Sequence, residues 1–252
     1  MGVKKEKYNL FKVKLGKSKT ILRFKNKFPR TFYFIAQRLS INKFNGLPLS
    51  IFFIAISFNL LLIFDFTEDI INSKKFIVID DFIAQFFFSL RNEQLAKFFY
   101  LLSLSCNILT VIILGFGISI YLLLKKKFHF VIGLLISILG SGLTIYLGKS
   151  IFKIGRPIEY SYYLENNFSF PSGHSTIVVS FYGLLFYFLL RNNYSIAIKG
   201  KFISVALLFF FLIGFSRLYL GVHFLSDVIA GYILGFIWLL VSICTIEWLK
   251  YK

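Results

Sequence analysis

The chain has 252 residues, of which 57% are apolar and 20% aromatic, and it carries a formal net charge of +18. A soluble domain of this length needs a larger polar share, and several apolar runs here are long enough to cross a bilayer. The composition therefore excludes an ordinary soluble domain and predicts an integral membrane protein.

The positive charge is concentrated near the N-terminus. Thirteen of the 29 basic residues lie between Lys4 and Lys43, where Glu6 is the one acidic residue. A basic, aromatic-containing segment ahead of the first apolar run is typical of a cytoplasmic segment lying on anionic lipid. Nucleic-acid binding is the poorer interpretation, because no recognisable nucleic-acid-binding fold accompanies the charge. We therefore distinguish a basic cytoplasmic or interfacial tail, residues 1–46, from a six-span domain, residues 47–252.

The apolar runs predict six transmembrane helices. They lie at about residues 49–66, 98–124, 128–148, 172–190, 202–215 and 228–248. The fifth run is too short to cross alone and needs residues from both flanks. Between the first two runs, an apolar–polar pattern led by Asp80 and continuing through Phe82, Phe86 and Leu90 predicts a surface helix. The predicted fold class is all-α, a polytopic membrane helical bundle with six transmembrane helices.

The interior of the predicted spans carries almost no charge, which counts against a transporter or a proton relay. Small residues such as Gly140, Thr144 and Gly148, and the pair Gly231 and Gly235, are interpreted as helix-packing contacts.

The distribution of Lys and Arg predicts the orientation of the bundle. With the N-terminus inside, the cytoplasmic segments hold 21 of the 29 basic residues. The external segments hold nine of the eleven acidic residues when Asp65 at the membrane edge is counted with them. Four external basic residues need a separate explanation: Lys149, Lys153, Arg156 and Arg217.

Residues 169–175 join a polar connection to the fourth apolar run and read Ser-Phe-Pro-Ser-Gly-His-Ser. Proline and glycine there predict a helix that begins at about Ser172 or Gly173. The N–H groups of its first turn have no partner within the helix and form an anion pocket. Ser172 can cap the turn or donate to the anion, Gly173 lets an oxyanion approach the backbone, and His174 can carry a proton.

Two further segments are predicted at the same membrane face, provided that the fifth span crosses. One follows the third span and contains Lys149 and Arg156, and the other precedes the sixth span and contains Arg217, His223 and Asp227. His223 and Asp227 are four residues apart and would share a face on a helix.

These groups suit phosphoryl transfer. Lys149, Arg156 and Arg217 can bind phosphate oxygens and stabilise the charge that spreads over them in the transition state. His223 can attack phosphorus through one ring nitrogen while a carboxylate orients the other. His174 remains to protonate the leaving oxygen.

Simpler interpretations stand beside this one. A helix start with an interfacial histidine accounts for residues 169–175 taken alone, and arginines at an outer membrane edge often contact only lipid head groups. His129, beside the cytoplasmic lysines, is interpreted as such an interfacial histidine.

Taken together, the three segments resemble the type 2 phosphatidic acid phosphatase family of membrane lipid phosphatases. The family pattern is Lys-x6-Arg-Pro, then Pro-Ser-Gly-His, then Ser-Arg-x5-His-x3-Asp, a combination more specific than any one of its strings. Its fixed positions are met by Lys149, Arg156, Pro157, Pro171, Ser172, Gly173, His174, Ser216, Arg217, His223 and Asp227. The motifs cover residues 149–227, the hydrophobic layout extends the likeness from about residue 49 to the end, and the basic tail lies outside it.

The resemblance implies a hydrolase that needs no metal or cofactor and acts through a phosphohistidine on His223, with its site at the outer leaflet. Asp227 would orient that histidine, and His174 would be the general acid. Five residues would hold the phosphate: Lys149, Arg156, Ser172, Gly173 and Arg217. The implied location is a bacterial cytoplasmic (inner) membrane with the active site on the extracytoplasmic side.

The resemblance leaves the substrate open among phosphatidic acid, phosphatidylglycerol phosphate, undecaprenyl diphosphate, lipid A phosphates and others. Soluble haloperoxidases share the pocket and hold vanadate in it, but six spans favour a lipid. The expected partners are a phospholipid or polyprenyl phosphate substrate and membrane lipids, with no nucleic acid. Two other classes are rivals: a lipid-translocating protein, which would need a polar path through the bundle, and a non-catalytic lipid-phosphate receptor, which would have no reason to keep His223, Asp227 and His174 together.

Overall fold

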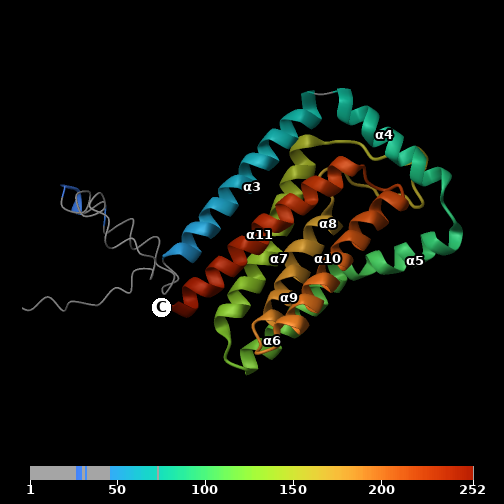
Figure 1. The fold of residues 1–252 in the computed structure, drawn as a ribbon. Helices are drawn as coiled ribbons and strands as arrows, with labels where there is room; N and C mark the ends of the chain where they lie inside the picture. Colours follow the sequence, from blue (N-terminus) through green and yellow to red (C-terminus); the bar gives the residue numbers. More distant parts are fainter. Residues whose placement is uncertain (1–26, 30–31, 33–45, 73, 252) are drawn as a thin grey trace, which may run out of the picture.

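The computed structural model describes residues 27–29, 32, 46–72 and 74–251, so the predicted basic tail lies almost entirely outside the described residues (Figure 1). In this part of the chain every regular element is helical. The helices are α3 (Leu47–Asn72), α4 (Lys74–Ser89), α5 (Glu93–Ser103), α6 (Ile108–Leu124), α7 (Phe128–Phe152), α8 (Gly173–Ile177), α9 (Gly183–Leu190), α10 (Ile196–Tyr219) and α11 (Leu225–Tyr251). A π-helical turn over Val178–Tyr182 makes α8 and α9 one continuous stretch.

Five helical stretches are long and apolar enough to cross a membrane. They are Pro48–Glu68, Phe128–Phe152, Gly173–Leu190, Ile196–Tyr219 and Leu225–Tyr251. The pair α5 and α6, bent by 44° at its junction, passes the same test as one broken span, which brings the number to six. The prediction of an all-α membrane bundle is therefore confirmed, and the bent pair of helices corresponds to the second predicted span.

The predicted continuous helix over residues 98–124 is wrong at its centre. A 3₁₀ turn at Leu104–Cys106 ends the first piece, and Asn107 adopts an extended conformation there. Its side chain accepts a hydrogen bond from Leu109 N (3.0 Å), which caps α6. Asparagine favours such a cap over a helix interior because its side chain satisfies an otherwise unpaired N–H group.

The short fifth run does gain residues from both flanks, as the sequence predicts. α10 begins after Ser195, whose hydroxyl accepts a hydrogen bond from Ile198 N (3.4 Å), and it continues to Tyr219. Its 24 residues span about 36 Å at the α-helical rise of 1.5 Å per residue. The helix is long enough for the segments before α8 and after α10 to lie at one end of the bundle.

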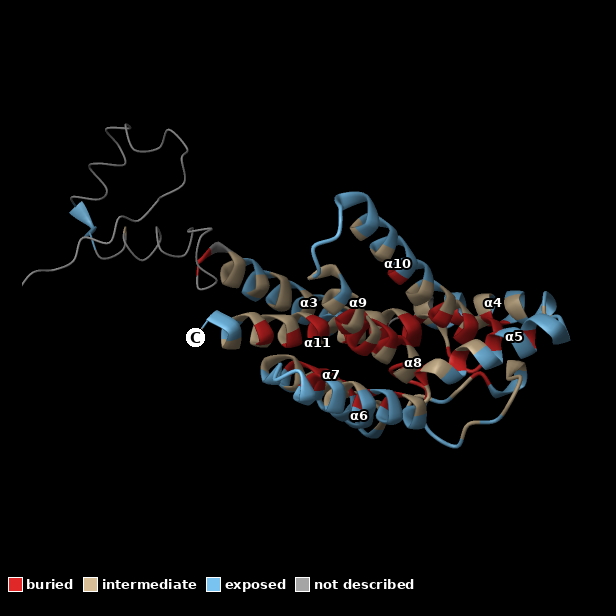
Figure 2. Cartoon of the chain, turned by 90° about the horizontal axis from the view of Figure 1, so that it is seen from below, coloured by how far each residue is buried: buried red, intermediate tan, exposed pale blue. Residues whose placement is uncertain are grey.

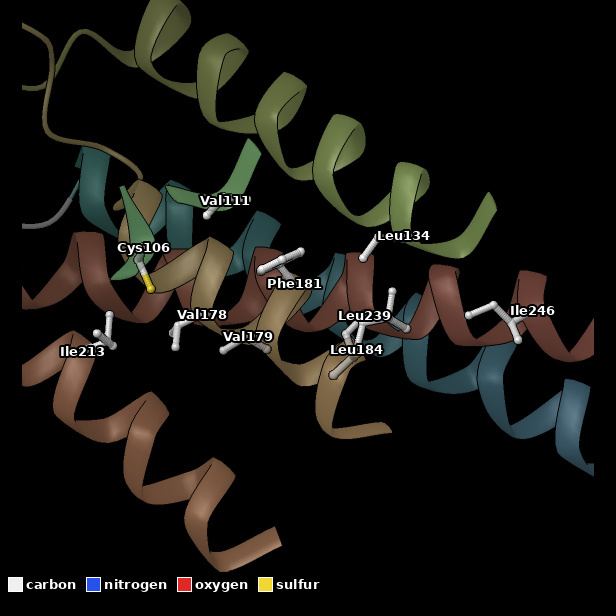
Figure 3. Close-up of a cluster of buried hydrophobic side chains, with 10 residues drawn as sticks. All are labelled: Cys106, Val111, Leu134, Val178, Val179, Phe181, Leu184, Ile213, Leu239 and Ile246. Atoms are coloured by element: carbon white, nitrogen blue, oxygen red, sulfur yellow. The ribbon is translucent and has the colours of Figure 1, made fainter. Parts of the chain in front are cut away.

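α11 is the central helix, and it packs against α3, α7 and α8 (Figure 1). Buried positions concentrate along α8 and α11, whereas α3 is largely exposed along its length (Figure 2). One cluster of ten buried side chains joins α8 and α9 to the surrounding helices, with Phe181 and Leu184 at its middle (Figure 3). Because lipid tails are as apolar as leucine, close packing has to hold such helices together.

Glycines permit the closest approach, between α8 and α11. A Cβ atom on Gly231 would lie 2.7 Å from the carbonyl oxygen of Ser172, and one on Gly235 would lie 2.5 Å from that of Thr176. The predicted packing role of this glycine pair is confirmed. It also has a consequence for the site, because it places the start of α8 directly against the first turns of α11.

The prediction of a helix after the first span is confirmed by α4. Asp80, which leads the pattern, is only 8% exposed, whereas Phe82 and Phe86 are exposed. The reason is a polar partner on another helix: Asp80 accepts hydrogen bonds from Ser226 at the start of α11. α4 and α5 lie at the end of the bundle opposite the C-terminus (Figure 1).

Candidate active site

Hydrogen bonds join the three motif-bearing segments at the end of the bundle where α4 and α5 lie (Figure 1). Ser172 N donates to the carbonyl oxygen of Asp227 (3.1 Å). The guanidinium of Arg156 donates to the carbonyl oxygen of Val222 (2.6 Å). The structure therefore brings together residues that are separated by up to 78 positions in the chain, from Lys149 to Asp227.

His223 and Asp227 are in contact, although for a different reason from the predicted one. His223 lies in the turn between α10 and α11 and is 2% exposed, and its Nδ1 is 3.4 Å from Oδ2 of Asp227. The two residues do not share a helix, because α11 begins only at Leu225. Instead Phe224 N donates to the Asp227 carboxylate (2.8 Å), which folds the first helical turn back towards the histidine.

Ser169 completes this pair and was not identified from the sequence. Its hydroxyl lies 3.2 Å from Nδ1 of His223 and donates a short hydrogen bond to Oδ2 of Asp227. Its own N–H group donates to the carbonyl oxygen of Ile154 (2.9 Å), which fixes it to the loop after α7. A serine just before Phe-Pro gives no sequence signal, because only the fold shows which residue it faces.

The contacts of His223 determine its tautomer. Nη1 of Arg156 lies 3.3 Å from Nε2 of His223, and a guanidinium can only donate hydrogen bonds. Nε2 therefore accepts, and the ring proton is on Nδ1, which faces Asp227 and Ser169. Burial, reinforced by the cations of Arg217, Arg156 and Lys149, lowers the pKa of His223 well below its usual value. The neutral form of the ring is therefore favoured, and its Nε2 lone pair is directed towards the arginine.

Arg156 contacts Nε2 of His223 directly, and the other two predicted cations, Lys149 and Arg217, act on the ring electrostatically. The Arg217 side chain is fully buried, and that of Arg156 is 5% exposed. Lys149 belongs to the last turn of α7 and not to the loop. Asn167, which the sequence analysis did not single out, accepts hydrogen bonds from Lys149 Nζ (3.1 Å) and from Nη2 of Arg156 (2.7 Å). Among the described residues no group of three or more His, Cys, Asp or Glu side chains could hold a metal ion.

Glu165 places a carboxylate between the two buried arginines. Oε2 lies 2.5 Å from Nη2 of Arg156, and Oε1 lies 2.7 Å from Nη2 of Arg217. The second guanidinium also donates to the hydroxyl of Tyr163 (2.8 Å), whose pKa is raised mainly by burial. Glu165 was missed because it lies in the loop between two motifs, where no local sequence pattern marks it as a site residue. The available signal was physical: buried guanidinium groups need a nearby anion.

The start of α8 has the predicted cap. The hydroxyl of Ser172 accepts hydrogen bonds from Ser175 N (3.4 Å) and from the Ser175 hydroxyl (3.0 Å), and Ser172 is fully buried. Of the two functions predicted for Ser172, the structure shows the capping one. Gly173 and His174 follow directly, and both line the cavity that reaches His223.

That cavity has a volume of about 860 Å³ and lies between α6 and α7, with α8 behind it. Its polar end is formed by Lys149, Glu165, His174 and His223. The rest is lined mainly by apolar side chains, among them Leu104, Ile108, Val111, Ile138, Leu139 and Ile177. The site thus combines a charged end suited to an anion with an apolar region suited to a hydrocarbon chain.

A helical membrane bundle with a cation-rich, histidine-containing site at one end defines a class of membrane proteins that bind anions. Comparison with known protein families identifies this class more specifically. Residues 130–251 match the model of the PAP2 superfamily. All eight predicted site residues lie within this range. The match confirms the resemblance found from the motifs.

Phosphatidylglycerophosphatase B of Bacillus subtilis (strain 168) is 42% identical over 72 residues, which is 28% of this chain. The match spans about a third, 36%, of that relative's length. The crystal structure of a transmembrane PAP2-type phosphatidylglycerolphosphate phosphatase from Bacillus subtilis has a TM-score of 0.68 at 24% identity. The structural match covers 74% of this chain and 93% of the chain in that crystal structure, so the two proteins share a fold. Aquifex aeolicus LpxE has a TM-score of 0.49 at 25% identity, covering 65% of this chain and 94% of its own.

Proposed function

We propose that this protein is an integral membrane phosphatase that hydrolyses a lipid phosphate or diphosphate through a phosphohistidine on His223. The observation that carries the proposal is the position of Nε2 of His223. It is the acceptor nitrogen of a buried histidine, it lies 3.3 Å from Nη1 of Arg156, and His223 and Lys149 line the charged end of an otherwise mainly apolar cavity. The superfamily match and the named activities of the relatives support the same reaction class.

In the proposed first step, Lys149, Arg156 and Arg217 bind the phosphate oxygens, with the backbone N–H group of Gly173 and the hydroxyl of Ser172 as further donors. Nε2 of His223 attacks phosphorus, and the bond from phosphorus to the lipid oxygen breaks. That oxygen takes a proton from His174. Asp227, helped by Ser169, stabilises the positive charge on the phosphorylated ring through its Nδ1–H group.

In the second step, His174 takes a proton from a water molecule that attacks the phosphohistidine. Inorganic phosphate leaves and His223 regains its lone pair. The three fixed cations neutralise charge that a metallophosphatase would neutralise with metal ions, so the proposed mechanism is metal-independent.

A lipid substrate is favoured by the cavity, because its apolar lining continues directly from the charged end. The candidate head groups are those of phosphatidic acid, phosphatidylglycerol phosphate, undecaprenyl diphosphate and lipid A. Phosphatidylglycerol phosphate is the first substrate to test, since the curated relative and the similar crystal structure from Bacillus subtilis are both named as phosphatases of that lipid.

For the membrane side, we propose that the site faces outward, in a bacterial inner membrane, since the basic segments gather at the opposite end. Cysteine labelling in intact cells tests this, in a variant that lacks Cys106 and Cys244. A cysteine at Leu164, which is 76% exposed beside the site, should react with an impermeant thiol reagent. A cysteine at Asn193, in the exposed turn before α10, should react only after the membrane is opened. The reverse pattern would place the site inside.

Phosphate release by the purified protein tests the reaction itself. The panel contains the four lipid classes above, each assayed with and without EDTA. We expect release from at least one lipid, at the same rate with chelator. Rapid quenching with ³²P-labelled substrate should trap an acid-labile, base-stable phosphoprotein. A binding or lipid-translocating function would instead give lipid binding without release on every member of the panel.

A further inference from the structure

The N-terminus of α11, which carries Asp227, is not capped by its own segment of chain. The helix begins at Leu225, and the residue before it is Phe224, whose side chain has no hydrogen-bonding group. The first N–H groups of a helix need acceptors from outside it, and Ser, Thr, Asp or Asn normally supplies one from the preceding position. Here that position is apolar.

Asp80 of α4 supplies the missing acceptor. Oδ1 accepts a hydrogen bond from Ser226 N (3.0 Å), and Oδ2 accepts one from the Ser226 hydroxyl (2.5 Å). The side chain of Asp80 thus caps α11 from a different helix, 146 residues away in sequence. Its residue is only 8% exposed, and a negative charge is favourable at a helix N-terminus.

The next residue after Ser226 is Asp227. One of its oxygens, Oδ2, accepts from Phe224 N and Ser169, while Oδ1 is buried with no hydrogen-bond partner among the described residues. The orientation of this carboxylate towards His223 therefore depends strongly on the backbone of the first turn. Asp80 fixes that turn from the other side.

We propose that Asp80 is a positioning residue for catalysis: by capping α11 from α4, it holds Asp227 in register with Nδ1 of His223. The inference rests on the proposed function for its kinetic consequence. α4 itself lies outside the part of the chain that matches the superfamily. The external helix is then part of the catalytic apparatus without contacting the phosphate.

Asp80→Asn tests the proposal with little change in size. The amide oxygen can still accept from Ser226 N, but the negative charge is lost, and the amide group can no longer accept from the hydroxyl with its second atom. We expect kcat to fall by about 10-fold or more, the size of effect seen when outer partners of functional side chains are removed. KM should stay within about twofold, because the phosphate-binding cations are unchanged.

Asp81→Asn is the matched control, since Asp81 is the exposed neighbour on the same helix and contacts Gln85 and Tyr160. Its kinetics should equal those of the wild type. A double-mutant cycle with Asp227→Asn gives the specific readout. If Asp80 acts through Asp227, adding Asp80→Asn to Asp227→Asn should cost almost nothing further. A full, additive loss in that background would overturn the proposal.

Hydrogen–deuterium exchange of the first turn of α11 provides a measurement that needs no turnover. Exchange of the Ser226 amide should be faster in Asp80→Ala, which removes the acceptor, than in Asp81→Ala, and equal rates would contradict the cap. A wild-type protein that is inactive on every lipid would reject the proposed function, and this measurement would still decide whether the cap exists. An active wild type with an unaffected Asp80→Asn variant would reject only the positioning role.

Discussion

Two arginine–glutamate clusters lie at opposite ends of the bundle, and they differ in charge balance. Near the C-terminus, Arg191 pairs with Glu247, and the Tyr187 hydroxyl donates to the same carboxylate. At the site, one carboxylate, Glu165, is shared by Arg156 and Arg217, with a third cation nearby. The first cluster is balanced, whereas the second has more cations than anions.

The cluster with excess positive charge is also the more deeply buried one. The side chains of Arg191 and Glu247 are about one-quarter exposed, at 27% and 24%, whereas that of Arg217 is fully buried. A buried charge without a full complement of counter-charge is unfavourable unless a ligand compensates for it. The comparison therefore separates a packing ion pair from a site that is incomplete without a second anion, and phosphate is the anion that the proposed function supplies.

The largest expected effect comes from His223→Ala, which removes the proposed nucleophile. We expect turnover to fall by more than about 10⁴-fold, in line with the removal of nucleophiles from other hydrolases. The assay is phosphate release from the best lipid of the panel. His129→Ala, at the end where Arg191 lies, is the control and should keep wild-type turnover. Near-normal turnover in His223→Ala would mean that another group is the nucleophile.

Arg217→Ala and Arg191→Ala test the comparison directly. The first removes a donor aimed at the phosphate and should lower kcat/KM by about 10²–10³-fold, the size of effect found for oxyanion-hole donors. The second breaks a balanced pair and should lower the melting temperature while leaving kcat/KM within a few-fold. Equal kinetic losses would show that the cations act through their bulk field and that the distinction between the clusters is wrong.

Much of this site could be predicted because most of its charged and catalytic residues lie in short sequence motifs. Six of the predicted site residues have fixed spacings within three short motifs: Lys149, Arg156, His174, Arg217, His223 and Asp227. If the fifth span crosses the membrane, these motifs must lie at the same end of the bundle. The apolar runs gave the helices for a similar reason, since hydrocarbon leaves few alternatives to a helix. Where a polar residue interrupts a run, as Asn107 does, hydropathy alone did not predict the break.

The residues that were missed are those whose role depends on three-dimensional neighbours. Ser169, Glu165 and Asp80 each bind a group from a segment at least 50 residues away. The pattern around Asp80 predicted only a surface helix, because an amphipathic pattern assumes that a carboxylate faces water. Asp80 is buried because it accepts a hydrogen bond from the N-terminus of a helix 146 residues later, and no local sequence pattern can reveal that contact.

Glu165→Gln sharpens the comparison by removing the carboxylate that Arg156 and Arg217 share. Without the carboxylate, Arg156 and Arg217 repel each other, so the phosphate-free protein should melt at a lower temperature. An incoming anion would no longer compete with Glu165, so inorganic phosphate should inhibit several-fold more strongly and should restore the melting temperature. Glu247→Gln at the other end is the control, and phosphate should not rescue it. Unchanged inhibition would mean that Glu165 and phosphate do not share the arginines.

The smallest expected effect concerns pH and follows from the electrostatics of His223. Burial and three cations lower its pKa, so the neutral nucleophile persists into acid solution, and the acid limb of kcat/KM should lie below the ordinary histidine value. Lys149→Gln removes one of those cations. The protonated ring then becomes less unfavourable, the pKa of His223 rises, and the acid limb should move to higher pH by less than about one unit.

The substrate phosphate also ionises near this pH, at about 6 for a monoester. The two enzymes must therefore be compared on the same lipid, so that this ionisation affects both profiles equally. Lys125→Gln, which removes a cation at the other end of the bundle, is the control and should leave the acid limb in place. A shift of the limb to lower pH in Lys149→Gln would contradict the assignment, because losing a cation cannot stabilise the neutral ring. An equal shift in both variants would show that net charge, and not the local cluster, sets the pKa of His223.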